Sequence, residues 1–264
     1  MPYATLNGHQ VYYEFGDQVE RPVLVLFNGI TMSTPAWTLL LPILQTQYRL
    51  LRFDFLGQGQ SDRPAGEKYT LTEQADMAMQ LIDHLGIERF YLVGLSYGGM
   101  VAQHFARRYQ ARILKLILAS TLAWSDEASQ RISDSWIAAH KAGGLDLRET
   151  ISIPWLFSSR FLAANSAMLE GLKQMAGMLD WNAVIRLING VKEHDARNWL
   201  HTLTVPTLIL VGNEDRLTPR YQAELIQERL LGATLEVIPY AAHVLHIEAA
   251  EAFSHAISRF CRPG

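Results

Sequence analysis

The stretch that says most about the architecture is Phe90-Tyr91-Leu92-Val93-Gly94-Leu95-Ser96-Tyr97-Gly98-Gly99. It begins with four apolar residues, which is typical of a buried strand, and it leads into a segment, 100–109, with the spacing of a helix. Gly94 and Gly98 flank Ser96 where the strand and the helix meet. Small residues relieve the crowding of such a sharp turn and leave the serine exposed above the sheet edge. The stretch therefore predicts a reactive serine at a helix N-terminus, where free amides favour negative charge.

Apolar runs like the first recur along the chain and alternate with helix-like segments. Helical spacing extends from 71 to 85, where Gly86 ends the pattern. Near the N-terminus, Asn7-Gly8 suits a tight turn between two short strands and predicts an opening β-hairpin. Strands that alternate with helices predict an α/β protein whose mostly parallel sheet is covered on both faces. The runs interpreted as strands of this sheet are 23–27, 48–53, 90–93, 113–118, 207–211 and 233–238.

The alternation of strands and helices stops near Trp124 and resumes at Thr207. We interpret residues 124–201 as a helical cap inserted into a core domain that comprises residues 1–123 and 202–264. The cap is expected to pack over one end of the sheet, since no flexible linker or low-complexity tract separates it from the core. Its helix-like segments are interrupted at Gly143-Gly144, Pro154 and Gly190.

The composition is that of an ordinary globular protein, with 49% hydrophobic and 19% charged residues among 264. The net charge is −3, and no run of Lys or Arg is dense enough to follow a phosphate backbone, so no nucleic-acid partner is predicted. The N-terminal residues lack the pattern of a secretory signal, and no stretch of about 20 apolar residues occurs, so neither export nor a membrane span is predicted. The single cysteine, Cys261, allows no internal disulfide, which favours a cytoplasmic location.

A serine hydroxyl is a weak nucleophile, so Ser96 needs a base and an acid that orients the base. Asp215 follows the apolar run 207–211, and His243 follows the run 233–238. The C-terminal ends of parallel strands share one edge of a sheet. The three side chains are therefore expected to converge at that edge.

Two other carboxylates compete with Asp215 for the role of the orienting acid. Glu214 is adjacent to it, and Asp126 follows the strand after the serine turn. Of these three carboxylates, Asp215 is the preferred candidate. His246, three residues after His243, raises the alternative of a metal pair, but no third ligand stands out. No metal site is predicted, and His246 is expected to line the pocket at the start of a helix.

Four segments resemble the α/β-hydrolase superfamily, and the resemblance extends over essentially the whole chain. Within that superfamily the chain most resembles the branch of 3-oxoadipate enol-lactonases and carboxylesterases. The resemblance implies the α/β-hydrolase fold, with Ser96 as the nucleophile, His243 as the base and Asp215 as the orienting acid. It also implies an oxyanion hole formed by the backbone amides of Ile30 and Tyr97. The segments are Val25-Leu26-Phe27-Asn28-Gly29-Ile30, Arg52-Phe53-Asp54-Phe55-Leu56-Gly57-Gln58-Gly59-Gln60-Ser61-Asp62, Gly94-Leu95-Ser96-Tyr97-Gly98-Gly99-Met100 and Ala241-Ala242-His243.

Many members of the superfamily carry His-Gly where this chain has Asn28-Gly29, and enol-lactonase-like sequences often carry Asn there. Asn28 is expected to contact substrate together with Trp124, Trp155 and His246. Other aromatic and methionine side chains of the cap are expected either to line an apolar acyl pocket or to form the core of the cap. They are Trp136, Phe157, Trp181, Met168, Met175 and Met178.

These residues predict a serine hydrolase that cleaves a small to medium carboxylic ester or lactone through an acyl-enzyme intermediate. No cofactor is required, and the small-molecule substrate is the only partner expected. The nearest alternatives are an acyltransferase and a thioesterase, because both use the same acyl-enzyme, and a non-catalytic ligand-binding protein is the alternative from another class. An enol-lactonase receives an anionic substrate, so a cap arginine is expected to face the pocket. The candidates are Arg131, Arg148, Arg160, Arg186 and Arg197.

Overall fold

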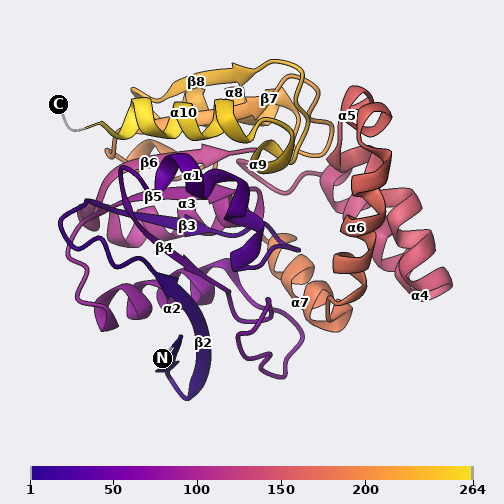
Figure 1. The fold of residues 1–264 in the computed structure, drawn as a ribbon, viewed down its shortest axis with the longest axis horizontal. Helices are drawn as coiled ribbons and strands as arrows, with labels where there is room; N and C mark the ends of the chain where they lie inside the picture. The colour runs from indigo at the N-terminus through magenta and orange to yellow at the C-terminus, as the bar shows by residue number, and fades with distance from the viewer. Residues whose placement is uncertain (1, 263–264) are drawn as a thin grey trace.

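The computed structural model describes residues 2–262, which form one sheet with helices on both faces (Figure 1). Within these residues the strand order is β1-β2-β4-β3-β5-β6-β7-β8. The pairs β1·β2 and β2·β4 are antiparallel, and every pair from β4 to β8 is parallel. The predicted α/β class, with a mostly parallel and doubly covered sheet, is therefore confirmed. The strands are β1 (Tyr3–Leu6), β2 (His9–Phe15), β3 (Val23–Phe27), β4 (Arg49–Phe53), β5 (Phe90–Leu95), β6 (Ile113–Ala119), β7 (Thr207–Gly212) and β8 (Thr234–Ile238).

Each central strand contributes side chains to two separate cores, one on each face of the sheet. Along β3, Val25 and Phe27 join one core, whereas Leu24 and Leu26 join the other, because successive side chains of a strand point in opposite directions. The first core is covered by α2 (Leu71–His84), α3 (Tyr97–Tyr109) and α8 (Arg220–Arg229). The second is covered by the 3-10 helix η1 (Thr34–Leu40), α1 (Leu41–Leu44), α9 (Leu245–Glu248) and α10 (Ala250–Cys261).

Local sequence signals account for the ends of the first elements. Asn7 and Gly8 both have positive φ, 48° and 84°, and join β1 to β2 as the predicted hairpin. Thr70 begins α2 with a capping box, in which its hydroxyl accepts from the Glu73 N–H while the Glu73 carboxylate accepts from the Thr70 N–H. The predicted helix 71–85 is thus found within one residue of its expected bounds.

Four α-helices lie between β6 and β7, beside the C-terminal edge of the sheet (Figure 1). We call α4 to α7 the insertion. The chain enters and leaves it side by side, because Ser125 N–H donates to the His194 carbonyl at 2.8 Å and Ala196 N–H donates to the Ala123 carbonyl at 2.9 Å. The bounds are α4 (Glu127–Leu156), α5 (Ser159–Ala164), α6 (Ser166–Gly177) and α7 (Trp181–Val191).

Two of the three interruptions expected in this region are absent. Gly143 and Gly144 do break the helical geometry inside α4. Pro154, in contrast, lies inside α4, which continues two residues further to Leu156. Gly190 lies inside α7, where a Cβ would come within 1.9 Å of the Tyr69 carbonyl oxygen, so this glycine permits close packing rather than ending the helix. Among the helices of residues 2–262, none is long and apolar enough to cross a membrane.

Candidate active site

Ser96 lies in a strained turn between β5 and α3. Its φ and ψ are 55° and −114°, a conformation that costs free energy for any residue with a side chain. A Cβ at Gly94 would lie 2.4 Å from the Gly98 carbonyl oxygen, and a Cβ at Gly98 would lie 2.2 Å from the carbonyl oxygen of Phe27 in β3. Both neighbours are backbone atoms, which cannot rotate away. Glycine at both positions is therefore what allows α3 to start directly beneath the turn.

The three residues predicted to act together meet at the C-terminal edge of the sheet. His243 Nε2 lies 2.9 Å from Ser96 Oγ, and His243 Nδ1 lies 3.1 Å from Asp215 Oδ2. Asp215 and His243 are both buried, with 7% and 5% of their surface exposed. Each ring nitrogen of the imidazole thus has one of the expected partners.

Gly212, at the end of β7, brings the segment before His243 close to the loop that carries Asp215. A Cβ at Gly212 would lie 2.3 Å from the Ala241 carbonyl oxygen, so only glycine allows the two loops to approach this closely. The Glu214 N–H donates to the same carbonyl at 3.0 Å and joins the loops.

Thr218 orients the Asp215 carboxylate and was not found from the sequence. Asp215 Oδ1 accepts from the backbone N–H groups of Leu217 and Thr218 at 3.0 and 2.8 Å, and Oδ2 accepts from the Thr218 hydroxyl at 2.7 Å. The hydroxyl oxygen also lies 3.2 Å from His243 Nδ1. The available signal was the threonine three residues after the aspartate, a spacing that suits a turn closed by the aspartate side chain.

Neither rival carboxylate contacts the imidazole. Asp126 begins α4 as its N-cap and accepts from the Ser129 N–H at 2.8 Å. It also accepts from the side chains of Tyr221 and Gln222 in α8. Burial raises its pKa, but these hydrogen bonds outweigh burial and hold the pKa below its usual value. Glu214 is half-buried and points no oxygen at His243 within hydrogen-bond distance.

The backbone amides of Ile30 and Tyr97 follow the neighbouring parallel strands β3 and β5. The Gln58 amide donates to the carbonyl oxygens of Gly29 and Ile30 at 2.8 and 3.2 Å. Because a trans peptide points its C=O and N–H in opposite directions, the Ile30 N–H is directed away from Gln58. Tyr97 is the first residue of α3, so its N–H has no partner within that helix. Among residues 2–262, no carbonyl accepts a turn or loop hydrogen bond from either N–H.

The structure does not support the expected contact between Asn28 and substrate. The side chain is completely buried. Its amide nitrogen donates to the Phe53 carbonyl at 2.9 Å and lies 3.3 Å from Gln58 Oε1, while its oxygen accepts from the Trp37 indole at 2.7 Å. Asn28 therefore holds Gln58, which in turn orients the Ile30 peptide.

The other residues expected to contact substrate are His246, Trp124 and Trp155, and only His246 is shown as a neighbour of His243. His246 is buried, and its burial and the neighbouring His243 lower its pKa to about 3, which keeps the imidazole neutral. Trp124 is half-buried at the root of the insertion, with the Arg197 guanidinium 3.9 Å above its ring. Trp155 is half-buried in the last turn of α4. Contact between these residues and a substrate stays a prediction.

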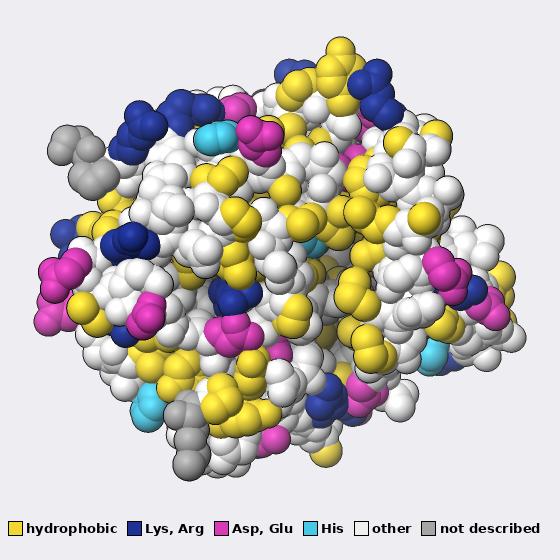
Figure 2. All heavy atoms as spheres, viewed as in Figure 1, with side chains coloured by type: hydrophobic (Ala, Val, Ile, Leu, Met, Phe, Trp, Pro, Cys, Tyr) yellow, Lys and Arg dark blue, Asp and Glu magenta, His cyan; other side chains and the backbone are white. Residues whose placement is uncertain are grey.

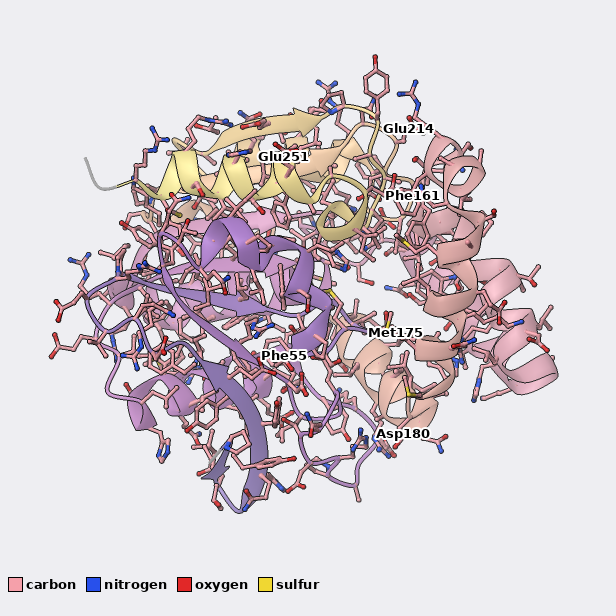
Figure 3. The ribbon with its side chains drawn as sticks, in the orientation of Figure 1. Phe55, Phe161, Met175, Asp180, Glu214 and Glu251 are labelled. Atoms are coloured by element: carbon pink, nitrogen blue, oxygen red, sulfur yellow. The ribbon has the colours of Figure 1, made fainter. Side chains whose placement is uncertain are left out.

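A groove runs between the main body and the insertion, and hydrophobic side chains lie along both of its walls (Figure 2). Met175 points from α6 toward the main body (Figure 3), and 55% of its surface is exposed. Of the five arginines considered, Arg148 is buried, 4.3 Å from the Trp181 ring centre and 3.6 Å from the Glu149 carboxylate. The other four are at least partly exposed, and they contact Glu127 (Arg131), Tyr240 (Arg160), Tyr69 (Arg186) and Asp195 (Arg197).

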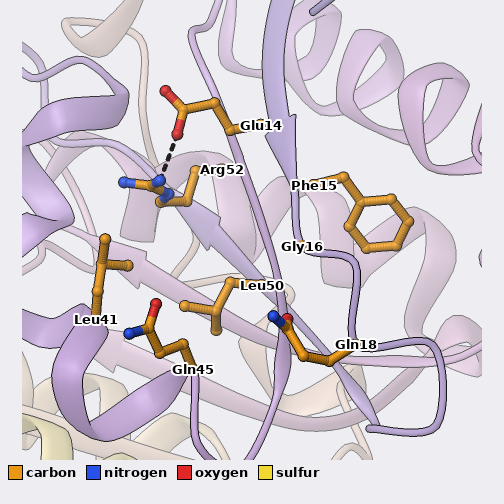
Figure 4. A pocket seen from close by; sticks show the side chains of 8 residues that line it. All are labelled: Glu14, Phe15, Gly16, Gln18, Leu41, Gln45, Leu50 and Arg52. Carbon is orange, nitrogen blue, oxygen red and sulfur yellow. Dashed lines mark hydrogen bonds and ion pairs between the residues drawn. The ribbon is translucent and has the colours of Figure 1, made fainter.

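Two further hollows in the surface are lined by neither Ser96 nor His243, and neither combines a hydroxyl, an imidazole and an orienting carboxylate. One, of about 180 Å³, lies beside β2 and β4 and is bordered by the ion pair of Glu14 with Arg52 (Figure 4). The other, of about 360 Å³, is lined by Thr72, His104, Arg107 and Arg108. In this second hollow the Thr72 hydroxyl lies 3.3 Å from His104 Nδ1, but the other ring nitrogen of His104 faces His194 at 3.2 Å instead of an acid. The Ser96 turn is therefore the best candidate for a catalytic centre in the described chain.

Comparison with known proteins agrees with this architecture. The family model for the alpha/beta hydrolase fold matches residues 22–136. The crystal structure of an alpha/beta hydrolase enzyme from a Medee basin deep-sea metagenome library is 30% identical, covers 98% of this chain and 96% of its own, and superimposes with a TM-score of 0.93. The enol-lactonase from Burkholderia xenovorans LB400 is 25% identical, with 98% and 99% coverage and a TM-score of 0.89. The 3-oxoadipate enol-lactonase 2 of Acinetobacter baylyi is 26% identical over 260 residues, 96% of this chain and 94% of that protein.

The chain belongs to the α/β-hydrolase family and lies near its enol-lactonase branch, as the resemblance of the sequence motifs predicted. It is a hydrolase of that family.

Proposed function

We propose that this hydrolase cleaves a small to medium carboxylic ester or lactone through an acyl-enzyme on Ser96. The observation that carries the proposal is the hydrogen-bonded line from Ser96 Oγ through the His243 imidazole to the Asp215 carboxylate, with distances of 2.9 and 3.1 Å. In this arrangement Nε2 accepts the hydroxyl proton while Oγ bonds to the carbonyl carbon. Asp215 keeps Nδ1 protonated and stabilises the imidazolium that forms.

The attack converts the carbonyl oxygen into an oxyanion. The N–H groups of Ile30 and Tyr97 are proposed to donate to it, and each such donor is worth about 3 kcal/mol of transition-state stabilisation. The bond to the leaving oxygen then breaks, and His243 returns the proton to that oxygen. Water repeats the sequence with His243 as its base and releases the carboxylic acid and free Ser96. With a lactone, acid and alcohol leave as one molecule.

The surroundings of Ser96 support a partly apolar substrate. Ser96 follows β5 at the edge of the sheet beside which the insertion lies (Figure 1), and the groove between the main body and the insertion has hydrophobic walls, to which Met175 contributes (Figures 2 and 3). We propose that residues 124–201 act as a cap over this groove, with Trp124, Trp155 and His246 in contact with substrate. A small molecule is the only partner that we propose, in the cytoplasm, and no nucleic acid or membrane takes part.

Reaction with a p-nitrophenyl alkylphosphonate tests the nucleophile. One equivalent of p-nitrophenol and a phosphonyl adduct on the peptide that contains Ser96 are expected. Ser96→Ala is expected to lose the adduct and about 10⁴-fold or more of kcat on p-nitrophenyl esters, whereas Ser166→Ala, at an exposed serine of α6, keeps both. Full activity of Ser96→Ala would refute the proposal.

A panel of esters, lactones and acyl thioesters, each with and without a competing alcohol, separates the alternatives. Free acid as the main product supports hydrolysis, and new ester in the presence of the alcohol indicates an acyltransferase. Preference for thioesters indicates a thioesterase. Binding without turnover of any member indicates a ligand-binding protein.

A further inference from the structure

The turn between α4 and α5 is hydrogen-bonded to the segment that carries the proposed base. We call residues 156–158 the α4–α5 turn. We call residues 243–248, which include the short helix α9, the base loop. The His243 N–H donates to the Leu156 carbonyl oxygen across 3.2 Å. At the other end of the base loop, the Ser158 N–H donates to Glu248 Oε1 at 2.9 Å, and the Ser158 hydroxyl donates to Oε2 at 2.6 Å. One turn of the insertion thus holds both ends of the base loop.

The Ser158–Glu248 contact has little freedom to change. Ser158 is 1% exposed, and its hydroxyl also accepts from the Phe161 N–H at 3.1 Å as the N-cap of α5. Burial raises the pKa of the Glu248 carboxyl, and hydrogen bonds from Ser158 and from the Ala242 backbone oppose that rise. Ala242 directly precedes His243, so the Glu248 carboxylate is also hydrogen-bonded to the backbone immediately before His243.

The loop of the orienting acid is attached to the same end of α4. Arg216, which follows Asp215, donates from its guanidinium to the Pro154 carbonyl oxygen at 3.3 Å. The C-terminal turn of α4 therefore contacts both loops that supply the proton-transfer groups.

We propose that Ser158 and Glu248 are positioning residues, which hold the base loop so that His243 Nε2 lies within reach of Ser96 Oγ. The inference rests on the proposed function, in which His243 is the base. Neither residue touches the reacting atoms. They act through the backbone of His243, and a shift of about 1 Å in a reacting group is enough to lower a rate about 100-fold. The α4–α5 turn thus belongs to the catalytic framework, although the rest of the insertion lies beside the groove.

Steady-state kinetics of Ser158→Ala, Glu248→Gln and the double variant test the proposal, with Ser159→Ala as the matched control at the exposed neighbouring position. Every kcat is divided by the concentration of sites titrated with the p-nitrophenyl phosphonate, so that unfolded protein does not count. The expected result is a kcat per site lowered about 5- to 10-fold by Ser158→Ala and about 10-fold or more by Glu248→Gln, with KM within twofold. The double variant is expected to resemble Glu248→Gln alone, because both changes remove one link.

A merely structural role predicts fewer titrated sites and a wild-type kcat per site, and that result overturns the inference while the proposed function stands. Additive effects of the two substitutions also overturn it. If the wild-type protein shows no phosphonate titration and no ester turnover, the proposed function fails, and this inference fails with it. Titration and turnover of the wild-type protein therefore distinguish the two failures.

Discussion

Replacing Gly98 by alanine is expected to damage the active site out of proportion to the single methyl group that it adds. The new Cβ would lie 2.2 Å from the Phe27 carbonyl oxygen and 2.7 Å from that of Asn28. A Cβ essentially never approaches another heavy atom more closely than 3.0 Å, so α3 and the end of β3 must separate by about 0.8 Å. Such overpacking costs about 1–3 kcal/mol of the free energy of unfolding.

The same separation acts on the proposed oxyanion hole, because Ile30 follows β3 and Tyr97 begins α3. A displacement of nearly 1 Å in one donor is expected to lower kcat about 100-fold. Urea unfolding measures the loss of stability, and hydrolysis of p-nitrophenyl acetate measures the loss of kcat.

Gly171→Ala is the matched control. Gly171 lies in α6, and a Cβ there would meet no heavy atom within 4 Å. The substitution is expected to raise the free energy of unfolding by about 0.5–1 kcal/mol, as alanine does in an open helix, and to leave kcat unchanged. If Gly98→Ala behaves like Gly171→Ala in both assays, the steric reasoning is wrong.

Three other changes have defined outcomes. Asp215→Asn is expected to lower kcat about 10⁴-fold and Asp126→Asn less than twofold, so equal losses in the ester assay would contradict the assignment of the acid. Thr218→Val removes the hydroxyl donor to Asp215, and a roughly tenfold lower kcat with little change in KM is expected from initial-rate measurements; a changed KM alone would argue against an orienting role. The folded protein keeps His246 neutral down to about pH 3, whereas the unfolded chain binds a proton below about pH 6.5, so this one histidine is expected to lower the free energy of unfolding by about 2 kcal/mol between pH 7 and 5. Thermal melts of His246→Gln over that range are expected to show a flatter pH dependence, and an unchanged slope would contradict the burial argument.

Most of the framework was predictable because its signals are local. The alternation of apolar runs with helical spacing predicted the sheet, and the glycines around Ser96 predicted the strained turn that the structure shows. Asp215 and His243 were found because each follows a strand, and parallel strands end at one edge.

The remaining features depend on contacts between distant segments. The sequence predicts that Asn28 contacts substrate, but its side chain is hydrogen-bonded to Trp37 and to the Phe53 carbonyl. Nothing in the sequence around Asn28 indicates these two contacts. The bond between Ser158 and Glu248 joins residues 90 positions apart. The sequence predicts a helix break at Pro154, but the proline lies in the last turn of α4. The residue at which a helix ends is difficult to predict from local sequence alone.

The two backbone segments that join the insertion to the rest of the chain are hydrogen-bonded to each other, which bears on protein engineering. Ala123 and Ala196 are hydrogen-bonded neighbours, although 72 residues separate them. Exchange of α4 to α7 for the corresponding part of a relative is therefore expected to leave the ends of β6 and β7 in place, provided that the α4–α5 turn with Leu156 and Ser158 is kept, because it holds the base loop. Such chimaeras would combine the proposed proton-transfer groups of one enzyme with the groove wall of another, and their activity on a panel of esters would test whether the insertion decides substrate choice.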